Sequence, residues 1–313
     1  MERIKKTPSL ASSSVALGCF DGMHIGHMAV LSAAFDAGNH EEHPCGLGDM
    51  SNIVFTARPT AKYEFPVWTP DDHARLMAEA GAELWVTPDF DSIRNLSPED
   101  FVGEILADKL RAVRVACGYN FRFGKDAAGG AEDLLRLCDA RGIECIVVPE
   151  VRQGGKEVST TAIRHMLAAG DVESANAMLG RRFGYTLPVI EGKKLGRTLG
   201  APTLNQSFNI GAAASYPRFG VYASCALAEN TWRYSVTNFG LRPTIGDVEK
   251  FCPISETWVP EFAGDLYGQN IRVEWLKFIR GEEKFGSLDE LRGAIFADAE
   301  AARQIYGRAI KND

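Results

Sequence analysis

Short apolar runs alternate with amphipathic stretches along the first half of the chain. Each run has the length of a buried strand, and each stretch between two runs repeats apolar residues at helical spacing. The sequence Ser-Pro-Glu-Asp at 97–100 is a typical helix start, and Gly81 ends an earlier helix. Strands that alternate with helices of this length predict a parallel sheet covered on both faces. The predicted strands are 15–17, 53–56, 84–87, 113–117 and 143–148, and the predicted helices are 28–35, 71–81, 131–141 and one that begins at 97.

The pattern changes near residue 183. From Tyr185 onward, short apolar runs are separated by glycine, proline and asparagine turns, as in a small all-β barrel. We therefore predict an α/β chain with a parallel-sheet domain over 1–182 and a small β-barrel domain with a terminal helix over 183–313. The terminal helix, predicted over 287–303, has five apolar residues at helical spacing, and we expect all of them in the core. These five are Leu288, Leu291, Ile295, Ala299 and Ala302.

Composition narrows the class of protein. The chain has 313 residues, 45% of them apolar and 24% charged, which is typical of a globular protein large enough for two domains. The net charge of −7 argues against nucleic acid or an anionic membrane as the main partner. Seven cysteines without a CxxC pair indicate reduced thiols. We therefore expect a cytoplasmic protein with no membrane or nucleic-acid partner, while the oligomeric state, a homo-oligomer included, stays open.

A glycine-rich turn with two histidines joins the first predicted strand to the first predicted helix. Residues 18–27 have the sequence Gly-Cys-Phe-Asp-Gly-Met-His-Ile-Gly-His. A strand that enters a helix through such a turn gathers free backbone N–H groups and the positive end of the helix dipole, which together bind anions. His24 and His27 can donate hydrogen bonds to one phosphate group, because imidazole titrates near neutral pH. The alternative is a structural turn with surface histidines.

This ten-residue frame, with its HxGH ending, resembles the signature of the bacterial bifunctional riboflavin kinase/FAD synthetases. The resemblance implies a Rossmann-like nucleotidyltransferase (FMN adenylyltransferase) domain over 1–182 and a riboflavin kinase domain over 183–313. It also implies that His24 and His27 are catalytic. The other residues of the turn that the resemblance assigns to ATP and its phosphates are Gly18, Phe20, Asp21, Gly22 and Gly26.

Two later segments of the first half resemble further signatures of that family. Residues 118–125 are similar to its G-x-D/N-F-R-F-G loop, which implies that Asn120 and Arg122 face the flavin and that the two phenylalanines are mostly structural. Residues 158–164 are similar to its ISSTxIR helix start. Hydroxyl and N–H groups at a helix N-terminus bind phosphates, so this segment is expected to hold ATP opposite the histidines. The residues assigned to this contact are Ser159, Thr160 and Arg164.

The second half resembles a riboflavin kinase. Residues 192–205 are similar to the family segment G-x-x-x-G-R-x-L-G-x-P-T-A-N, which assigns Thr203 and Asn205 to Mg²⁺. Glu256 stands where the family has its catalytic glutamate, a general base for the riboflavin 5′-hydroxyl. The residues assigned to ATP are Gly192, Lys194, Gly196 and Arg197, and those assigned to the flavin are Arg242 and Arg292.

The resemblance implies two reactions that use ATP and Mg²⁺: phosphorylation of riboflavin to FMN, and transfer of AMP to FMN to give FAD and pyrophosphate. The chain departs from the family at 56–61, where Arg58 and Thr60 replace an acidic residue and a histidine. Two alternatives therefore stay open. The chain retains only one of the two activities, or it is a non-catalytic regulatory protein that binds flavin or nucleotide.

Overall fold

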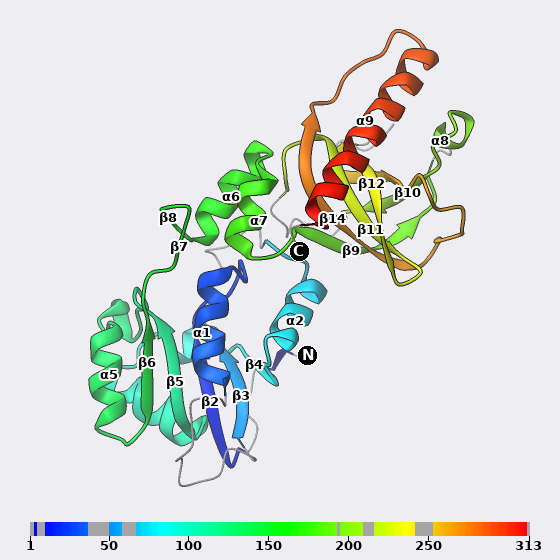
Figure 1. Ribbon diagram of the computed structural model, residues 1–313. Helices are drawn as coiled ribbons and strands as arrows, with labels where there is room; N and C mark the ends of the chain where they lie inside the picture. The colour runs from blue at the N-terminus through cyan, green and yellow to red at the C-terminus, as the bar shows by residue number, and fades with distance from the viewer. Residues whose placement is uncertain are drawn as a thin grey trace. The chain divides into compact units, whose positions relative to one another are not determined.

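The chain folds into two compact units (Figure 1). The first comprises Met1–Glu64 and Pro70–Thr160, and the second comprises Phe65–Thr69 and Thr161–Asp313. The division into functional domains at 182/183 stays a prediction. The computed structural model describes residues 3–4, 10–36, 50–57, 67–192, 195–208, 216–241 and 253–311.

The first unit is built on a parallel sheet with the strand order β1-β4-β3-β2-β5-β6. Leu17, the last residue of the central strand β2, pairs with Phe55 of β3 and with Cys117 of β5. The carboxyl ends of neighbouring strands therefore meet at one edge, which is where parallel sheets bind ligands. The predicted parallel sheet is confirmed, and β1 is a strand that the sequence did not predict. The strands are β1 (Arg3–Ile4), β2 (Ser12–Leu17), β3 (Met50–Phe55), β4 (Leu84–Val86), β5 (Ala112–Gly118) and β6 (Glu144–Val148), and the hairpin β7 (Arg152–Gln153) and β8 (Lys156–Glu157) follows them.

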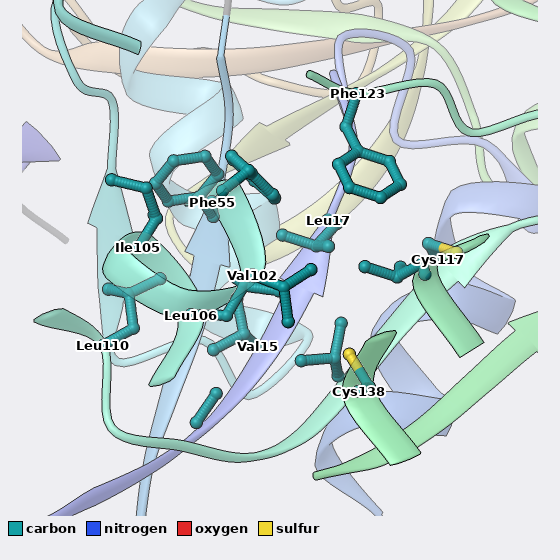
Figure 2. Close-up of a cluster of buried hydrophobic side chains, with 14 of the residues drawn as sticks. Val15, Leu17, Phe55, Val102, Ile105, Leu106, Leu110, Cys117, Phe123 and Cys138 are labelled. Atoms are coloured by element: carbon teal, nitrogen blue, oxygen red, sulfur yellow. The ribbon is translucent and has the colours of Figure 1, made fainter. Parts of the chain in front are cut away.

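Both faces of the central strand are buried. Val15 and Leu17 point into an apolar cluster that includes Val102 and Leu106 (Figure 2). Ala16, on the opposite face, is also fully buried. A strand covered on both faces reads as a continuous apolar run, which explains why the pattern predicted it. The helices of this unit are α1 (Ile25–Phe35), α2 (Pro70–Glu79), α3 (Phe90–Ile93), α4 (Pro98–Asp100) and α5 (Ala131–Asp139).

The predicted helix start at 97 is confirmed and continues in an unexpected form. The Ser97 hydroxyl accepts a hydrogen bond from the Asp100 N–H at 3.0 Å, and Pro98 occupies the first helical position. From Phe101 to Lys109 the helix widens to π-helical geometry, so the Leu110 N–H reaches the Ile105 carbonyl at 2.9 Å. The segment carries four of its apolar side chains into the core: Phe101, Val102, Ile105 and Leu106.

Among the described residues, the cysteines are free thiols, as the sequence predicts. Burial raises the pKa of Cys117 and of Cys225 to about 12, so both are protonated at neutral pH. Cys45 and Cys252 lie outside the described residues. The described thiols are Cys19, Cys117, Cys138, Cys145 and Cys225.

The second unit contains a closed antiparallel barrel with the order β10-β13-β12-β11-β14-β9, which confirms the predicted small barrel. Gly184 begins one of its strands, and a side chain there would collide with the Val273 carbonyl oxygen of the neighbouring strand. The strands are β9 (Gly184–Ile190), β10 (Thr203–Ser207), β11 (Gly220–Ala228), β12 (Thr231–Leu241), β13 (Pro253–Trp258) and β14 (Asn270–Arg280). The helices are α6 (Thr160–Ala169), whose first residue belongs to the first unit, α7 (Val172–Leu179), α8 (Leu195–Thr198) and α9 (Leu288–Ala309).

Helix α9 packs against the barrel through only part of its predicted apolar stripe. Ala299 and Ala302 are buried, as predicted, in a cluster with barrel residues. Leu288 is 61% exposed, so the prediction that the whole stripe packs into the core is wrong at the first turn. The physical reason is that the first half of the helix borders a cavity. Leu288, Leu291 and Ile295 line this cavity and do not pack fully against the barrel.

Residues 67–69 belong to the second unit although they precede most of the first. Trp68 is 1% exposed, and its ring centroid lies 5.6 Å from that of Phe183. Phe183 in turn meets Tyr185 edge-on at 5.0 Å. A large buried aromatic side chain contributes several kcal/mol to stability, so Trp68 anchors this segment. The sequence did not predict this anchor.

Candidate functional site

A cavity of about 750 Å³ lies at the carboxyl ends of the parallel strands in the first unit. Its wall includes Leu17 of β2, Phe55 of β3 and Val148 of β6, and a volume of this size suits a nucleotide or flavin. Most of the site residues predicted in this half share the cavity. The predicted residues in its lining are Gly18, Phe20, His24, Gly26, His27, Asn120, Arg122, Ser159 and Thr160.

The glycine-rich turn lies tightly against the start of α6. A side chain at Gly22 would lie 2.8 Å from Oγ1 of Thr160, so only glycine allows this approach. Phe20 and Met23 have positive φ values of 49° and 46°, a strained conformation for residues with side chains. Their burial, with exposed fractions of 1% and 0%, holds them there. The fold thus places Thr160, the last residue of the first unit, directly beside the turn.

The two histidines form a stacked pair. His24 is the N-cap of α1, and its Nδ1 accepts a hydrogen bond from the His27 N–H at 3.2 Å. The ring centroids are 3.7 Å apart with an interplanar angle of 13°. Gly26 makes room for this stack, because a side chain there would lie 3.2 Å from the His24 ring.

Burial and the hydrogen bond to Nδ1 set the protonation of His24. Burial lowers the pKa of His24 to about 4, so the ring is neutral at neutral pH. Because Nδ1 accepts a hydrogen bond, the remaining proton of the neutral ring lies on Nε2. His24 is therefore a neutral ring whose Nε2–H is available to donate a hydrogen bond.

The loop after β5 forms another wall of the cavity. Phe123 is buried, and its ring lies 5.3 Å from that of Phe101 in the core, which supports the predicted structural role. Asn120 and Arg122 are exposed at the cavity wall. The Tyr119 hydroxyl donates to the Glu157 carboxylate at 2.9 Å, which ties this loop to β8. Sequence reasoning gave neither Tyr119 nor Glu157 a role, and both line the cavity.

Three residues predicted for this site are not in the cavity lining. Asp21 is 2% exposed, and Gly22 contributes through its approach to Thr160. Arg164 belongs to the second unit. Their contacts with ATP stay predictions. Arg58 and Thr60 lie outside the described residues.

A second cavity, of about 730 Å³, lies between the outer face of the barrel and α9. Asn205, Glu256 and Asn238 line it from three neighbouring strands. Asn205 pairs with Glu256 across β10 and β13, and Asn238 pairs with Glu256 across β12 and β13. Directly paired residues of antiparallel strands hold their side chains side by side on one face. The three side chains therefore form one polar row; the sequence gave roles to the first two and none to Asn238.

The Asn205 side chain is buried, and its amide group is held in a fixed position. It is 4% exposed, and its Nδ2 donates to the Thr203 carbonyl at 3.4 Å. Among the described residues, no donor reaches its buried Oδ1. A side chain at Gly192 would lie within 2.7 Å of the Asn205 amide, so this glycine is needed for the amide to keep its position. An amide oxygen left in this way fits a cation ligand.

An ion pair fixes the α9 wall of this cavity. The Arg280 guanidinium donates from Nη2 to Oδ2 of Asp298 at 2.7 Å, and its Nε lies 3.2 Å from both carboxylate oxygens. Asp298 is buried, with 5% exposed, whereas the Arg280 side chain is 21% exposed. The ion pair links the end of β14 to the middle of α9, and both residues line the cavity.

The remaining predicted residues of this half have different positions. Gly196 lines the cavity, whereas Arg197 donates to the Tyr267 hydroxyl at 3.5 Å and is exposed. Arg292 is exposed and lies over the Phe296 ring at 5.7 Å, outside the lining. The ATP and flavin contacts of Arg197 and Arg292 stay predictions. Lys194 and Arg242 lie outside the described residues.

Known protein families match both halves of the chain. The FAD synthetase family matches residues 6–162, and the riboflavin kinase family matches residues 179–306. A bifunctional riboflavin kinase/FMN adenylyltransferase from Bacillus subtilis is 31% identical over 307 residues, which cover 96% of this chain and 95% of that protein. The chain belongs to the bifunctional riboflavin kinase/FMN adenylyltransferase family.

Other members of this family agree in length. The Escherichia coli K12 protein is 32% identical over 94% of this chain and 92% of its own length, and the Pseudomonas fluorescens protein is 33% identical over 92% and 91%. A crystal structure from Streptococcus pneumoniae, described as a macrolide-efflux protein, matches with a TM-score of 0.80 and 26% identity over 96% of this chain and 98% of that one. Across the described ranges of this chain, no helix has the length and apolar character to cross a membrane.

Proposed function

We propose that this chain makes FAD from riboflavin in two steps, one at each cavity. The barrel unit phosphorylates riboflavin to FMN with ATP, and the parallel-sheet unit transfers AMP from a second ATP to FMN. The observation that carries this proposal is the presence of two separate sites of suitable chemistry in one chain of this family. One holds a row of two amides and a carboxylate, and the other holds a stacked pair of histidines at a glycine-rich turn.

At the barrel site, Glu256 is the general base. Its carboxylate takes the proton of the riboflavin 5′-hydroxyl while the hydroxyl oxygen attacks the γ-phosphorus of ATP, and ADP leaves. Asn205 and Asn238 flank Glu256 in the register, so they orient the groups that meet there. The apolar side chains of α9 that line the cavity, among them Leu291 and Ile295, suit the flat flavin ring.

The barrel site also fits Mg²⁺. Asn205 offers a buried amide oxygen that no described donor satisfies, and Thr203 adds a hydroxyl oxygen in the same lining. Oxygen ligands that leave room for water and phosphate suit this ion. Bound there, Mg²⁺ supplies charge neutralisation on the phosphates. Thr203 and Asn205 would hold it.

At the sheet site, the reaction needs no protein nucleophile. A phosphate oxygen of FMN attacks the α-phosphorus of ATP, the bond to the β-phosphate breaks, and pyrophosphate leaves. His24 donates from Nε2, and His27 lies stacked beside it, so both can stabilise negative charge on the phosphates. Backbone N–H groups of the turn and the start of α1 add to this effect.

The test supplies the purified chain with riboflavin, ATP and Mg²⁺ and separates the flavins by chromatography. FAD as the final product supports the proposal. FMN alone means that only the kinase step is active, and unchanged riboflavin with measurable flavin binding means a binding protein. A parallel reaction that starts from FMN tests the second step without the first.

We further infer that the chain acts on small molecules in the cytoplasm. The net charge of −7 gives nucleic acid no general attraction, and the described cysteines are reduced thiols. Gel filtration with light scattering would determine the oligomeric state.

A further inference from the structure

A third histidine, His73 of α2, contacts the glycine-rich turn from behind. Its Nε2 lies 2.9 Å from the carbonyl oxygen of Phe20. A carbonyl oxygen only accepts hydrogen bonds, so Nε2 of His73 carries the proton and donates it. His73 is 4% exposed and is not among the residues that line the cavity.

The carbonyl that His73 holds belongs to the strained part of the turn. Phe20 has a φ of 49°, and its carbonyl oxygen also accepts the Met23 N–H at 3.3 Å, where Met23 has a φ of 46°. Residues with side chains persist in this conformation only when their surroundings fix them. His73 is one such support, placed 53 residues away in the sequence.

Phe20 connects this support to the catalytic pair. Its ring lies 5.3 Å from the ring of His27, and two of its atoms lie 3.0 to 3.1 Å from where a side chain on Gly18 would begin. The ring therefore fills the space between the turn and His27. A change in the Phe20 backbone would move this ring and, with it, the surface against which His27 rests.

His73 is itself held in place. Its ring meets the Trp85 ring edge-on at 4.7 Å, and the Trp85 Nε1–H donates to Oγ1 of Thr56 at 3.3 Å. Thr56 directly follows β3, and Trp85 lies on β4. These contacts connect the ends of neighbouring strands to the turn that follows β2.

We propose that His73 is a positioning residue for FMN adenylyl transfer, which holds the Phe20 carbonyl so that His24 and His27 keep the geometry of the reaction. The proposal rests on the proposed function of this cavity and names a residue that acts there without touching substrate. Its hydrogen bond matters in the transition state, so its loss lowers kcat more than it raises KM.

The test compares two substitutions of His73 in the full chain. His73→Leu fills the space without a donor, whereas in His73→Gln the side-chain amide nitrogen can reach the position of the imidazole Nε2. Glu79→Gln is the matched control, because it removes an exposed ion pair with Arg75 on the same helix. The measurements are kcat and KM for FAD formation from supplied FMN and ATP, and the rate of FMN formation from riboflavin.

We expect His73→Leu to lower kcat for FAD formation about 30-fold, with KM for both substrates changed by less than about threefold. His73→Gln should keep at least about a third of the wild-type kcat, and Glu79→Gln should match the wild type. FMN formation should stay unchanged in all three variants, which shows that each chain is folded at the barrel.

Three results would overturn the proposal. His73→Leu keeps full kcat for FAD formation, both activities fall together, or His73→Gln falls as far as His73→Leu. The last result would mean that the imidazole ring matters for packing against Trp85 and not for its hydrogen bond. Absence of FAD formation in the wild type is a separate outcome, because it rejects the proposed function of the cavity itself.

Discussion

The two candidate sites are built in different ways. In the first unit, the site consists of loops that follow the ends of parallel strands, and its turn depends on backbone geometry at Phe20 and Gly22. In the barrel, the polar row of Asn205, Glu256 and Asn238 lies within regular strands. A site in a loop is one continuous stretch of sequence and can be recognised as such. A site on paired strands exists only once the register is set.

This difference has consequences for substitutions. The loop site depends on small residues and on hydrogen bonds to the backbone, so changes behind it can impair it. The barrel site depends on side chains held by a rigid scaffold, so changes there act mainly at the substituted residue. The two sites also provide internal controls for each other, because they lie in separate compact units.

The largest effect is expected for Glu256→Gln. The amide cannot accept the proton of the riboflavin hydroxyl, so FMN formation should fall about 10³-fold. FAD formation from supplied FMN should stay within about twofold of the wild type, since the other unit performs it. Chromatographic assays of both reactions measure these rates. An equal loss of both activities would contradict the assignment of separate sites.

A smaller loss is expected for His27→Ala, and it affects FAD formation instead of FMN formation. Removal of one group that stabilises phosphate charge should lower FAD formation about 10²-fold. Riboflavin phosphorylation should continue, so FMN accumulates as the end product. The time course of the three flavins measures this directly. FAD formation at the wild-type rate would show that the His27 side chain has no catalytic role.

The pH dependence of stability offers a third test, centred on His24. The pKa of His24 is about 4 in the folded chain and near 6.5 in the unfolded chain, so between these values the unfolded state binds more protons. The contribution of the neutral His24 ring to the free energy of unfolding is complete above pH 6.5 and decreases as the pH falls toward 4. The expected loss between pH 7 and pH 5 is about 2 kcal/mol.

Urea unfolding of the wild type and of His24→Asn at pH 7 and pH 5 measures this loss. Asparagine keeps an oxygen that can cap α1 but does not titrate. The wild type should lose more stability than the variant on acidification. The same loss in both chains would mean that His24 is not the group responsible.

The smallest effect is expected for Gly192→Ala in the barrel unit. Gly192→Ala places a methyl group within 2.7 Å of the Asn205 amide, so the amide must move. FMN formation should fall about tenfold, with a higher Mg²⁺ requirement. Gly293→Ala is the control, because nothing lies within 4 Å of its added carbon, and a helical alanine adds about 0.5–1 kcal/mol of stability. A Mg²⁺ titration of both variants tests whether the Asn205 position sets the metal requirement.

Some of the candidate site residues could be recognised from the sequence alone, and others could not. The turn at 18–27 and the segment at 158–164 were recognisable because each is contiguous, whereas the close approach of Gly22 to Thr160 is a finding of the structure. Tyr119 and Glu157 gave no signal, because their hydrogen bond joins residues 38 positions apart. The flavin contact of Arg292 stays a prediction, and the sequence did not indicate that its guanidinium lies over the Phe296 ring.

By itself, the sequence determined most of the strands and helices along the chain, the caps such as Ser97, and the family to which the chain belongs. Local physics governs these features: apolar periodicity, turn geometry and side-chain hydrogen bonds to nearby backbone. Only the tertiary structure decided that Asn238 lies beside Glu256, that His73 supports Phe20, and that Leu288 is exposed. Each of these depends on how distant segments pack. For Asn238, a shift of one residue in the strand pairing would turn the side chain to the opposite face.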